Sequence, residues 1–137
     1  MYSLYKVAAF AALAVATSRT TAPSGALVVG SSGTYSTIQD AVNALDSDSS
    51  SAQSIFIQAG TYDEQVYIQA LGGPLTIYGY TEDTSSYASN QVTITASHAL
   101  ADEDSDDATA TLRVWTTDFK MYVPEHSVWD SQAQYSC

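Results

Sequence analysis

Residues 55–66 read Ile-Phe-Ile-Gln-Ala-Gly-Thr-Tyr-Asp-Glu-Gln-Val, and they join two short runs that have the alternating pattern of β-strands. Aliphatic side chains stand at every second position, at Ile55 and Ile57 in the first run and at Val66 and Ile68 in the second. A period of two places such side chains on one face of a sheet. We therefore expect strands at 54–58 and 65–69, with a turn over 60–64 between them.

The same strand pattern returns along the chain. Further β-type runs lie at 26–29, 75–79, 91–95, 109–115 and 119–123. The intervals from Ile55 to Leu75 and from Val66 to Val92 lie in the range of solenoid repeats. Strands that return at such intervals without intervening helices predict a parallel β-helix, in which each coil stacks on the next. An antiparallel sandwich also contains many short strands and is the alternative.

One amphipathic helix precedes most of these strands. Ser36 and Gln39 have the spacing of a capping box at its start. Its apolar stripe consists of Ile38, Ala41, Val42 and Leu45. A β-helix has an open first coil that would expose apolar side chains. We expect this helix to cap the N-terminal end of the solenoid.

The charge of the chain limits its partners. The 137 residues carry 4 Lys+Arg against 15 Asp+Glu, a formal net charge of −11. Nucleic acids and anionic membrane surfaces are therefore excluded as partners, because both require clustered cations. Cys137 is the only cysteine, so the sequence predicts neither an internal disulfide nor a cysteine-based zinc site.

Residues 1–16 have the pattern of a secretory signal peptide. Lys6 precedes an apolar run over 7–16, and Ala14-Val15-Ala16 fits the small-x-small cleavage pattern. This apolar run is too short to span a hydrocarbon core of about 30 Å. We expect the mature chain to begin near Thr17 and to be secreted; a buried N-terminal helix is the alternative.

No reaction follows from motifs alone. His98 and His126 fit no metal-ligand or catalytic spacing. The acidic run 102–107 resembles the start of a calcium loop but lacks its later residues, so we expect a solvated loop and no metal site. Asp63 and Glu64 are adjacent, and adjacent residues of extended chain point to opposite faces, so a role at a coil corner is favoured over paired acid–base chemistry.

Several stretches together resemble the N-terminal part of the fungal pectin methylesterases (pectinesterases). The matching segments are 18–26, 35–42, 55–66, 75–79 and 107–112. Segment 55–66 contains the family's Gly-x-Tyr-x-Glu-x-Val signature as Gly60, Tyr62, Glu64 and Val66. The segments occur in the family's order, and the likeness covers residues 18–122.

The resemblance implies a right-handed parallel β-helix that hydrolyses methyl esters of galacturonate units in pectin to pectate and methanol, without a metal or organic cofactor. It also implies a nucleophilic Asp, a proton-donating Asp, a Gln at the oxyanion and a positioning Arg. None of these four residues can be placed on this chain, because the likeness ends near Tyr122. We therefore expect residues 17–122 to form the N-terminal coils of a truncated β-helix that is inactive alone, followed by a divergent tail at 123–137.

Two residues are candidates for contact with substrate. Thr109 and Thr111 lie in the coil nearest the missing cleft and are expected at its edge. Inward packing, or a threonine ladder between strands, accounts for them equally well. The alternative function is a secreted, non-catalytic β-solenoid that binds carbohydrate through some of its ten tyrosines.

Overall fold

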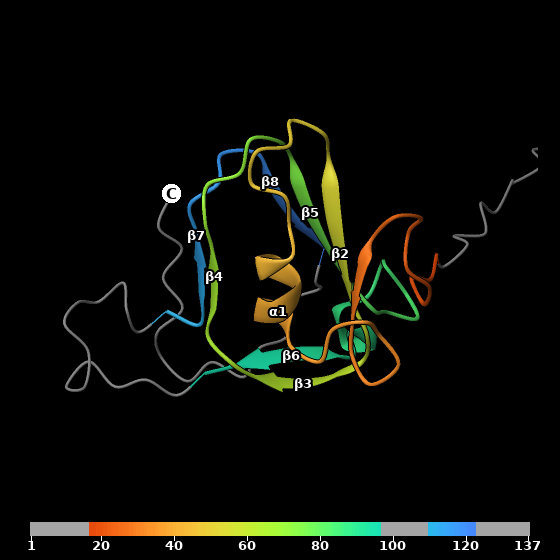
Figure 1. The fold of residues 1–137 in the computed structure, drawn as a ribbon. Coiled ribbons are helices and arrows are strands. Elements are labelled where there is room, and N and C mark those ends of the chain that lie inside the picture. Colours follow the sequence, from red (N-terminus) through yellow and green to blue (C-terminus); the bar gives the residue numbers. More distant parts are fainter. Residues whose placement is uncertain (1–16, 97–109, 123–137) are drawn as a thin grey trace, which may run out of the picture.

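The computed structural model describes residues 17–96 and 110–122, which wind into a coil of short strands (Figure 1). The strands are β1 (Leu27–Val29), β2 (Gln53–Ile57), β3 (Gly60–Asp63), β4 (Val66–Ile68), β5 (Leu75–Gly79), β6 (Val92–Thr95), β7 (Leu112–Val114) and β8 (Phe119–Tyr122). The described helices are α1 (Ile38–Asn43) and the short 3₁₀ helix η1 (Tyr87–Ser89).

The strands form three parallel sheets, in the orders β1-β2-β5-β8, β3-β6 and β4-β7. Strands β2, β3 and β4 make one coil of the chain, and β5, β6 and β7 make the next coil against it. Each coil therefore contributes one strand to each sheet, which defines a parallel β-helix. The predicted parallel β-helix is confirmed for the described residues, and the antiparallel sandwich is wrong.

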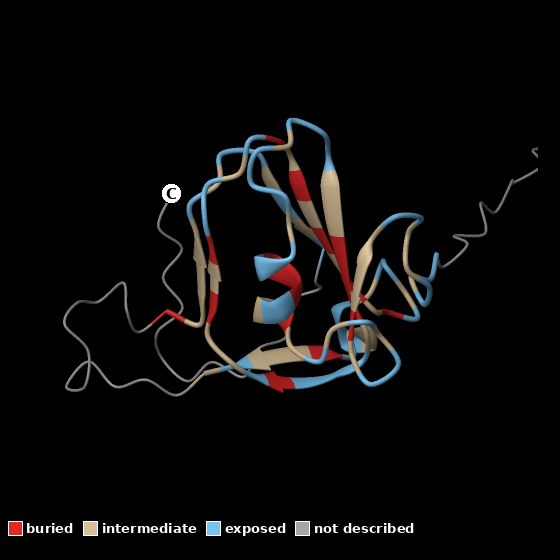
Figure 2. Ribbon diagram, viewed as in Figure 1, coloured by how far each residue is buried: buried red, intermediate tan, exposed pale blue. Residues whose placement is uncertain are grey.

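The core is a set of side-chain ladders inside this coil. Ile55 pairs with Ile77, which pairs with Met121 on the following strand. On another side of the coil, Val66 pairs with Leu112. Figure 2 shows the buried residues along the inner strands and on one side of α1. Stacked aliphatic side chains thus exclude water along the axis of the coil, which is the main source of its stability.

The coils are not of equal length along the sequence, so the strand partners differ from those that regular spacing predicts. Val66 does not lie over Val92, since Val92 pairs with Gly60 in a different sheet. The interval from Gly60 to Val92 is longer than the interval from Ile55 to its partner Ile77. The chain has more residues between β5 and β6 than between β2 and β3, and sequence spacing alone does not reveal where these extra residues lie.

The segment 60–63, predicted as a turn, is strand β3. Its alternation is hidden because only Tyr62 is buried, whereas Gly60, Thr61 and Asp63 are exposed. With one aromatic residue as its only inward side chain, the strand has no aliphatic signal. Its strand conformation comes from pairing with β6 and not from local propensity.

Helix α1 begins one residue later than predicted. Its N-cap is Thr37, whose hydroxyl accepts a hydrogen bond from Asp40 N at 3.1 Å, so the Ser36–Gln39 capping box is wrong. Ile38, Ala41 and Val42 are buried in the core, and Leu45 packs against it just after the helix ends. The predicted apolar stripe is therefore confirmed.

Several predictions concern residues outside the described ranges. These are the leader 1–16, the acidic run 102–107, the tail 123–137, and His98, Thr109, His126 and Cys137. Within 17–96 and 110–122, no helix is long and apolar enough to cross a membrane.

Substitutions at Ile77 test the inner ladder. Ile77 is 1% exposed and lies between Ile55 and Met121. Ile77→Ala is expected to lower the free energy of unfolding by about 2–5 kcal/mol, and Ile77→Val by about 0.5–1.5 kcal/mol. Chemical denaturation measures both losses. Thr76→Ala is the control on the outer face of the same strand, and an equal loss there would contradict the inward direction of Ile77.

Candidate functional site

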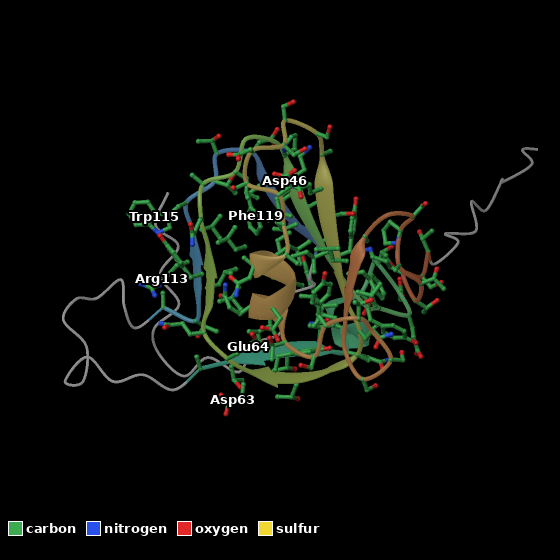
Figure 3. The ribbon with its side chains drawn as sticks, in the orientation of Figure 1. Asp46, Asp63, Glu64, Arg113, Trp115 and Phe119 are labelled. Carbon is green, nitrogen blue, oxygen red and sulfur yellow. The ribbon has the colours of Figure 1, made fainter. Side chains whose placement is uncertain are left out.

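Glu64 fastens α1 to the corner between β3 and β4. One carboxylate oxygen accepts Ile38 N at 2.8 Å, and the other accepts Gln39 N at 2.9 Å. These two N–H groups are among the helix donors that have no partner within the helix. Figure 3 shows Glu64 inside the coil beneath α1, while the neighbouring Asp63 points outward. The two adjacent acids thus act separately, as their opposite directions predicted.

Gln39 makes the second link between α1 and the coil. Its side-chain oxygen accepts Tyr67 N at 2.7 Å, and its amide nitrogen donates to Tyr67 O at 3.2 Å and to Asn43 Oδ1 at 2.9 Å. The Gln39 side chain therefore makes the two hydrogen bonds to the Tyr67 backbone that a neighbouring strand would otherwise make. This contact explains why the side chain is not available for a capping box.

Tyr62 closes the turn between β2 and β3. Its hydroxyl donates to Gln58 O at 2.9 Å, and the residue is 9% exposed. Burial of the phenol, and secondarily the negative charge of Glu64, raise the pKa of Tyr62 above its ordinary value. In the Gly-x-Tyr-x-Glu-x-Val signature, Tyr62, Glu64 and the fully buried Val66 all have structural contacts, so these three residues build a coil corner.

Arg19 clamps the lead-in segment to the second coil. Its guanidinium carbon lies 5.6 Å from the ring centroids of both Tyr78 and Tyr122. Its Nη1 donates to Gly79 O at 3.1 Å and to Tyr122 O at 2.6 Å. The backbone of Arg19 also pairs with Thr81, through N–H···O bonds of 2.8 and 3.0 Å. These contacts hold Arg19 against the outer side of the coil.

An aromatic ladder lies on the outer face of the same sheet. Phe56 pairs with Tyr78, and Tyr78 pairs with Tyr122. The rings of Tyr78 and Tyr122 are stacked, with centroids 5.6 Å apart and planes 10° apart. Neither this ladder nor the role of Arg19 is predicted by the sequence pattern. The only signal of the ladder is the recurrence of aromatic residues at 56, 78 and 122, which needs the strand register to be recognised.

A second polar and aromatic surface covers the sheet of β4 and β7. We call Tyr67, Thr111, Arg113 and Trp115 the β7 outer surface. The guanidinium carbon of Arg113 lies 5.0 Å from the Tyr67 ring centroid, and Trp115 is 61% exposed. Arg113 and Trp115 lie on the side of β7 that faces away from α1 (Figure 3). This surface combines a cation with an exposed aromatic ring.

The predicted site residues are only partly placed. Thr109 lies outside the described residues, whereas Thr111 is partly exposed directly before β7, where its carbonyl accepts Val66 N at 2.9 Å. Among the described residues, no three His, Cys, Asp or Glu side chains gather in a group that could hold a metal ion.

Parallel stacking of three-stranded coils places the chain in the class of β-solenoid proteins. The sequence matches the family model described as Pectinesterase over residues 26–122, a range that begins directly before β1 and ends with β8. The chain belongs to the pectinesterase family.

Individual relatives agree with this assignment. The chain is 58% identical to a pectinesterase of Aspergillus niger over 114 residues, which cover 82% of this chain and 34% of that protein. It is 56% identical to a pectinesterase of Aspergillus aculeatus over 115 residues, which cover 81% of this chain and 34% of that protein. The chain thus spans about a third of the length of the curated relatives it matches.

A solved structure is also similar. The crystal structure of the deglycosylated pectin methylesterase from Aspergillus niger superimposes with a TM-score of 0.71 at 50% sequence identity. The superposition covers 77% of this chain and 34% of that one.

Removing the carboxylate of Glu64 tests the helix anchor. Glu64→Ala leaves the N–H groups of Ile38 and Gln39 without their acceptor, so we expect a loss of about 1.5–3 kcal/mol in the free energy of unfolding. Asp63→Ala, at the exposed neighbouring position, should change it by less than about 0.5 kcal/mol. Denaturant titration of the two variants measures the difference, and equal losses would show that Glu64 is not the anchor.

The raised pKa of Tyr62 predicts a dependence on alkaline pH. Because the folded pKa exceeds the unfolded value of about 10, the contribution of Tyr62 to stability is complete below that value. It is lost as the pH rises through the folded pKa. We expect the wild type to exceed Tyr62→Phe in stability by about 0.5–1.5 kcal/mol at pH 8 and by less at pH 11.

Denaturation curves at several pH values measure this difference. Tyr87→Phe, at a ring that is 68% exposed, controls for the removal of one phenol. A wild-type advantage over Tyr62→Phe that stays constant from pH 8 to pH 11 would contradict the predicted titration.

Proposed function

We propose that this chain is the N-terminal part of a pectin methylesterase, which hydrolyses methyl esters of galacturonate units in pectin to pectate and methanol. The observation that carries the proposal is the family match over 26–122, since it coincides with the segment whose strands stack into the β-helix. The named substrate of the similar crystal structure is pectin. A non-catalytic carbohydrate-binding solenoid is not favoured, because the matched relatives are described as pectinesterases.

Ester hydrolysis by the implied mechanism needs a carboxylate nucleophile, a carboxylic acid as proton donor, an oxyanion-binding amide and a guanidinium. Glu64 and the two described arginines are engaged in other contacts. Both oxygens of Glu64 accept backbone N–H groups, and Arg19 and Arg113 lie against tyrosine rings. We therefore propose that the catalytic groups belong to further coils of the kind present in the longer relatives, and that residues 17–122 supply the start of the solenoid.

The proposal includes three finer features. The coil winds in the right-handed sense that parallel crossovers strongly prefer. Helix α1 covers the first coil, in keeping with the burial of Ile38, Ala41 and Val42. Residues 1–16 direct the chain to secretion, which brings the protein to pectin outside the cell.

A transplant tests the proposed function. Residues 17–122 replace the matching third of the Aspergillus niger pectin methylesterase, and methanol release from methyl-esterified pectin is measured. We expect the chimera to retain activity within about tenfold of its parent, because the transplanted coils share its fold. The 137-residue chain alone should release no methanol above a heat-killed control.

The remaining two thirds of the parent enzyme, without any replacement coils, is the matched control and should be inactive. A chimera that folds, as judged by its circular dichroism, but releases no methanol would contradict the proposed function. Methanol release by the 137-residue chain would show that it holds a complete catalytic site.

A further inference from the structure

The segment before β1 runs along the outer side of the largest sheet. We call residues 17–26 the N-terminal strap; they lead into β1 at one edge of the sheet β1-β2-β5-β8. Near the start of the strap, Arg19 lies against Tyr78 of β5 and Tyr122 of β8. Strand β2 lies between β1 and β5, so the strap passes β2 on its way to β1. Figure 1 shows the strap, in red and orange, outside the coil.

The burial of Phe56 fits a strap that crosses the outer face of β2. Ile55 and Ile57 belong to the core cluster, so alternation directs Phe56 to the outer face. Phe56 is nevertheless only 2% exposed, whereas Tyr122, at the other end of the aromatic ladder, is 49% exposed. Residues 22–23 of the strap are half-buried. The ladder is thus shielded at β2 and open at β8.

The site that holds the Arg19 side chain is assembled from two successive coils. Its Nη1 donates to Gly79 O at the end of β5 and to Tyr122 O at the end of β8. Its guanidinium also lies over the rings of Tyr78 and Tyr122, which are stacked on each other. Strand β8 therefore contributes one of the two carbonyl acceptors and one of the two rings. The site is complete only when β8 is stacked in register on β5.

The backbone of the strap is held by the loop that follows β5. Arg19 N donates to Thr81 O at 2.8 Å, Thr81 N donates to Arg19 O at 3.0 Å, and Thr84 N donates to Thr17 O at 2.7 Å. A strand pair as short as this is marginal alone in water. Closure of the strap therefore depends on the Arg19 side chain, whose contacts with carbonyls and rings are of the stronger kinds.

We propose that the N-terminal strap is a conformational device that closes only when β8 is stacked in register on β5. Arg19 and its acceptor Tyr122 are 103 residues apart in the chain, so the strap closes after the intervening coils have formed. The closed strap ties the start of the described chain to its last described strand. Separation of β8 from β5 removes the Tyr122 ring and carbonyl from Arg19 and releases the strap. The device is independent of ester hydrolysis.

Hydrogen exchange of the 137-residue chain, followed at single amides by NMR, tests this device. The reporter amides are those of Thr81 and Thr84, which donate to the strap. The reference is the Tyr80 amide, which donates to Ile57 O in the sheet. In the wild type we expect the reporters to exchange faster than the reference, because the strap opens locally while the coil stays folded.

Two positions connect the strap to β8. Arg19→Gln removes the forked cation and should accelerate exchange at Thr81 and Thr84 by about tenfold or more, with Tyr80 changed by less than about twofold. Tyr122→Leu removes one ring and should accelerate the same reporters by about threefold or more. Tyr122→Phe keeps the ring and is the matched control, within about twofold of the wild type. The double variant should equal Arg19→Gln alone, because Tyr122 acts on the strap through Arg19.

Trypsin gives a second measurement that leaves Arg19 in place, because this protease cleaves after arginine. Cleavage between Arg19 and Thr20 requires an opened strap, so its rate follows the population of the open form. We expect Tyr122→Leu to be cut at this bond about threefold faster or more, and Tyr122→Phe at the rate of the wild type. Mass spectrometry identifies the bond that is cut.

Three results would overturn the device. Unchanged reporter exchange in Tyr122→Leu, together with acceleration in Arg19→Gln, would show that the strap does not respond to β8. Additive effects in the double variant would show that Tyr122 does not act through Arg19. Equal exchange of the reporters and Tyr80 in the wild type would show that the strap opens only with the whole coil. Circular dichroism checks that each variant is folded, as expected because Tyr122 is half-exposed.

Discussion

The in-register stacking of one coil on the next is the constraint on which the whole structure depends. Strands as short as these do not persist alone, and each obtains its backbone hydrogen bonds from the neighbouring coils. The same register aligns Ile55, Ile77 and Met121 inside the coil and Phe56, Tyr78 and Tyr122 outside it. One geometric relation therefore creates both the core and the outer aromatic ladder, in which Phe56 is itself buried.

Polar side chains secure the places where the coil turns or the chain enters it. Glu64 and Gln39 bind α1 to the β3–β4 corner, and Arg19 binds the lead-in to the end of β5 and β8. The residues by which the pectinesterase resemblance is recognised thus build the scaffold.

The inner and outer faces divide the roles of the molecule. Most inward positions are aliphatic and form the core. The β7 outer surface illustrates this division, since Leu112 and Val114 pack against the core while Arg113 and Trp115 lie on the other side of the strand. A short strand thereby supports packing and presents a cation beside an aromatic ring.

The sequence by itself determined the apolar stripe of α1 and most strand positions, because alternation of aliphatic residues is a local signal. The return of the strands along the chain favoured a parallel β-helix over an antiparallel sandwich. It also predicted that Asp63 and Glu64 act separately. Tertiary structure alone decided the strand nature of 60–63, the pairing of Val66 with Leu112, the N-cap at Thr37 and the clamp of Arg19 on Tyr78 and Tyr122. Most of these depend on contacts between residues of different coils. Because the segments that connect the strands differ in length, sequence spacing does not predict which residues make those contacts.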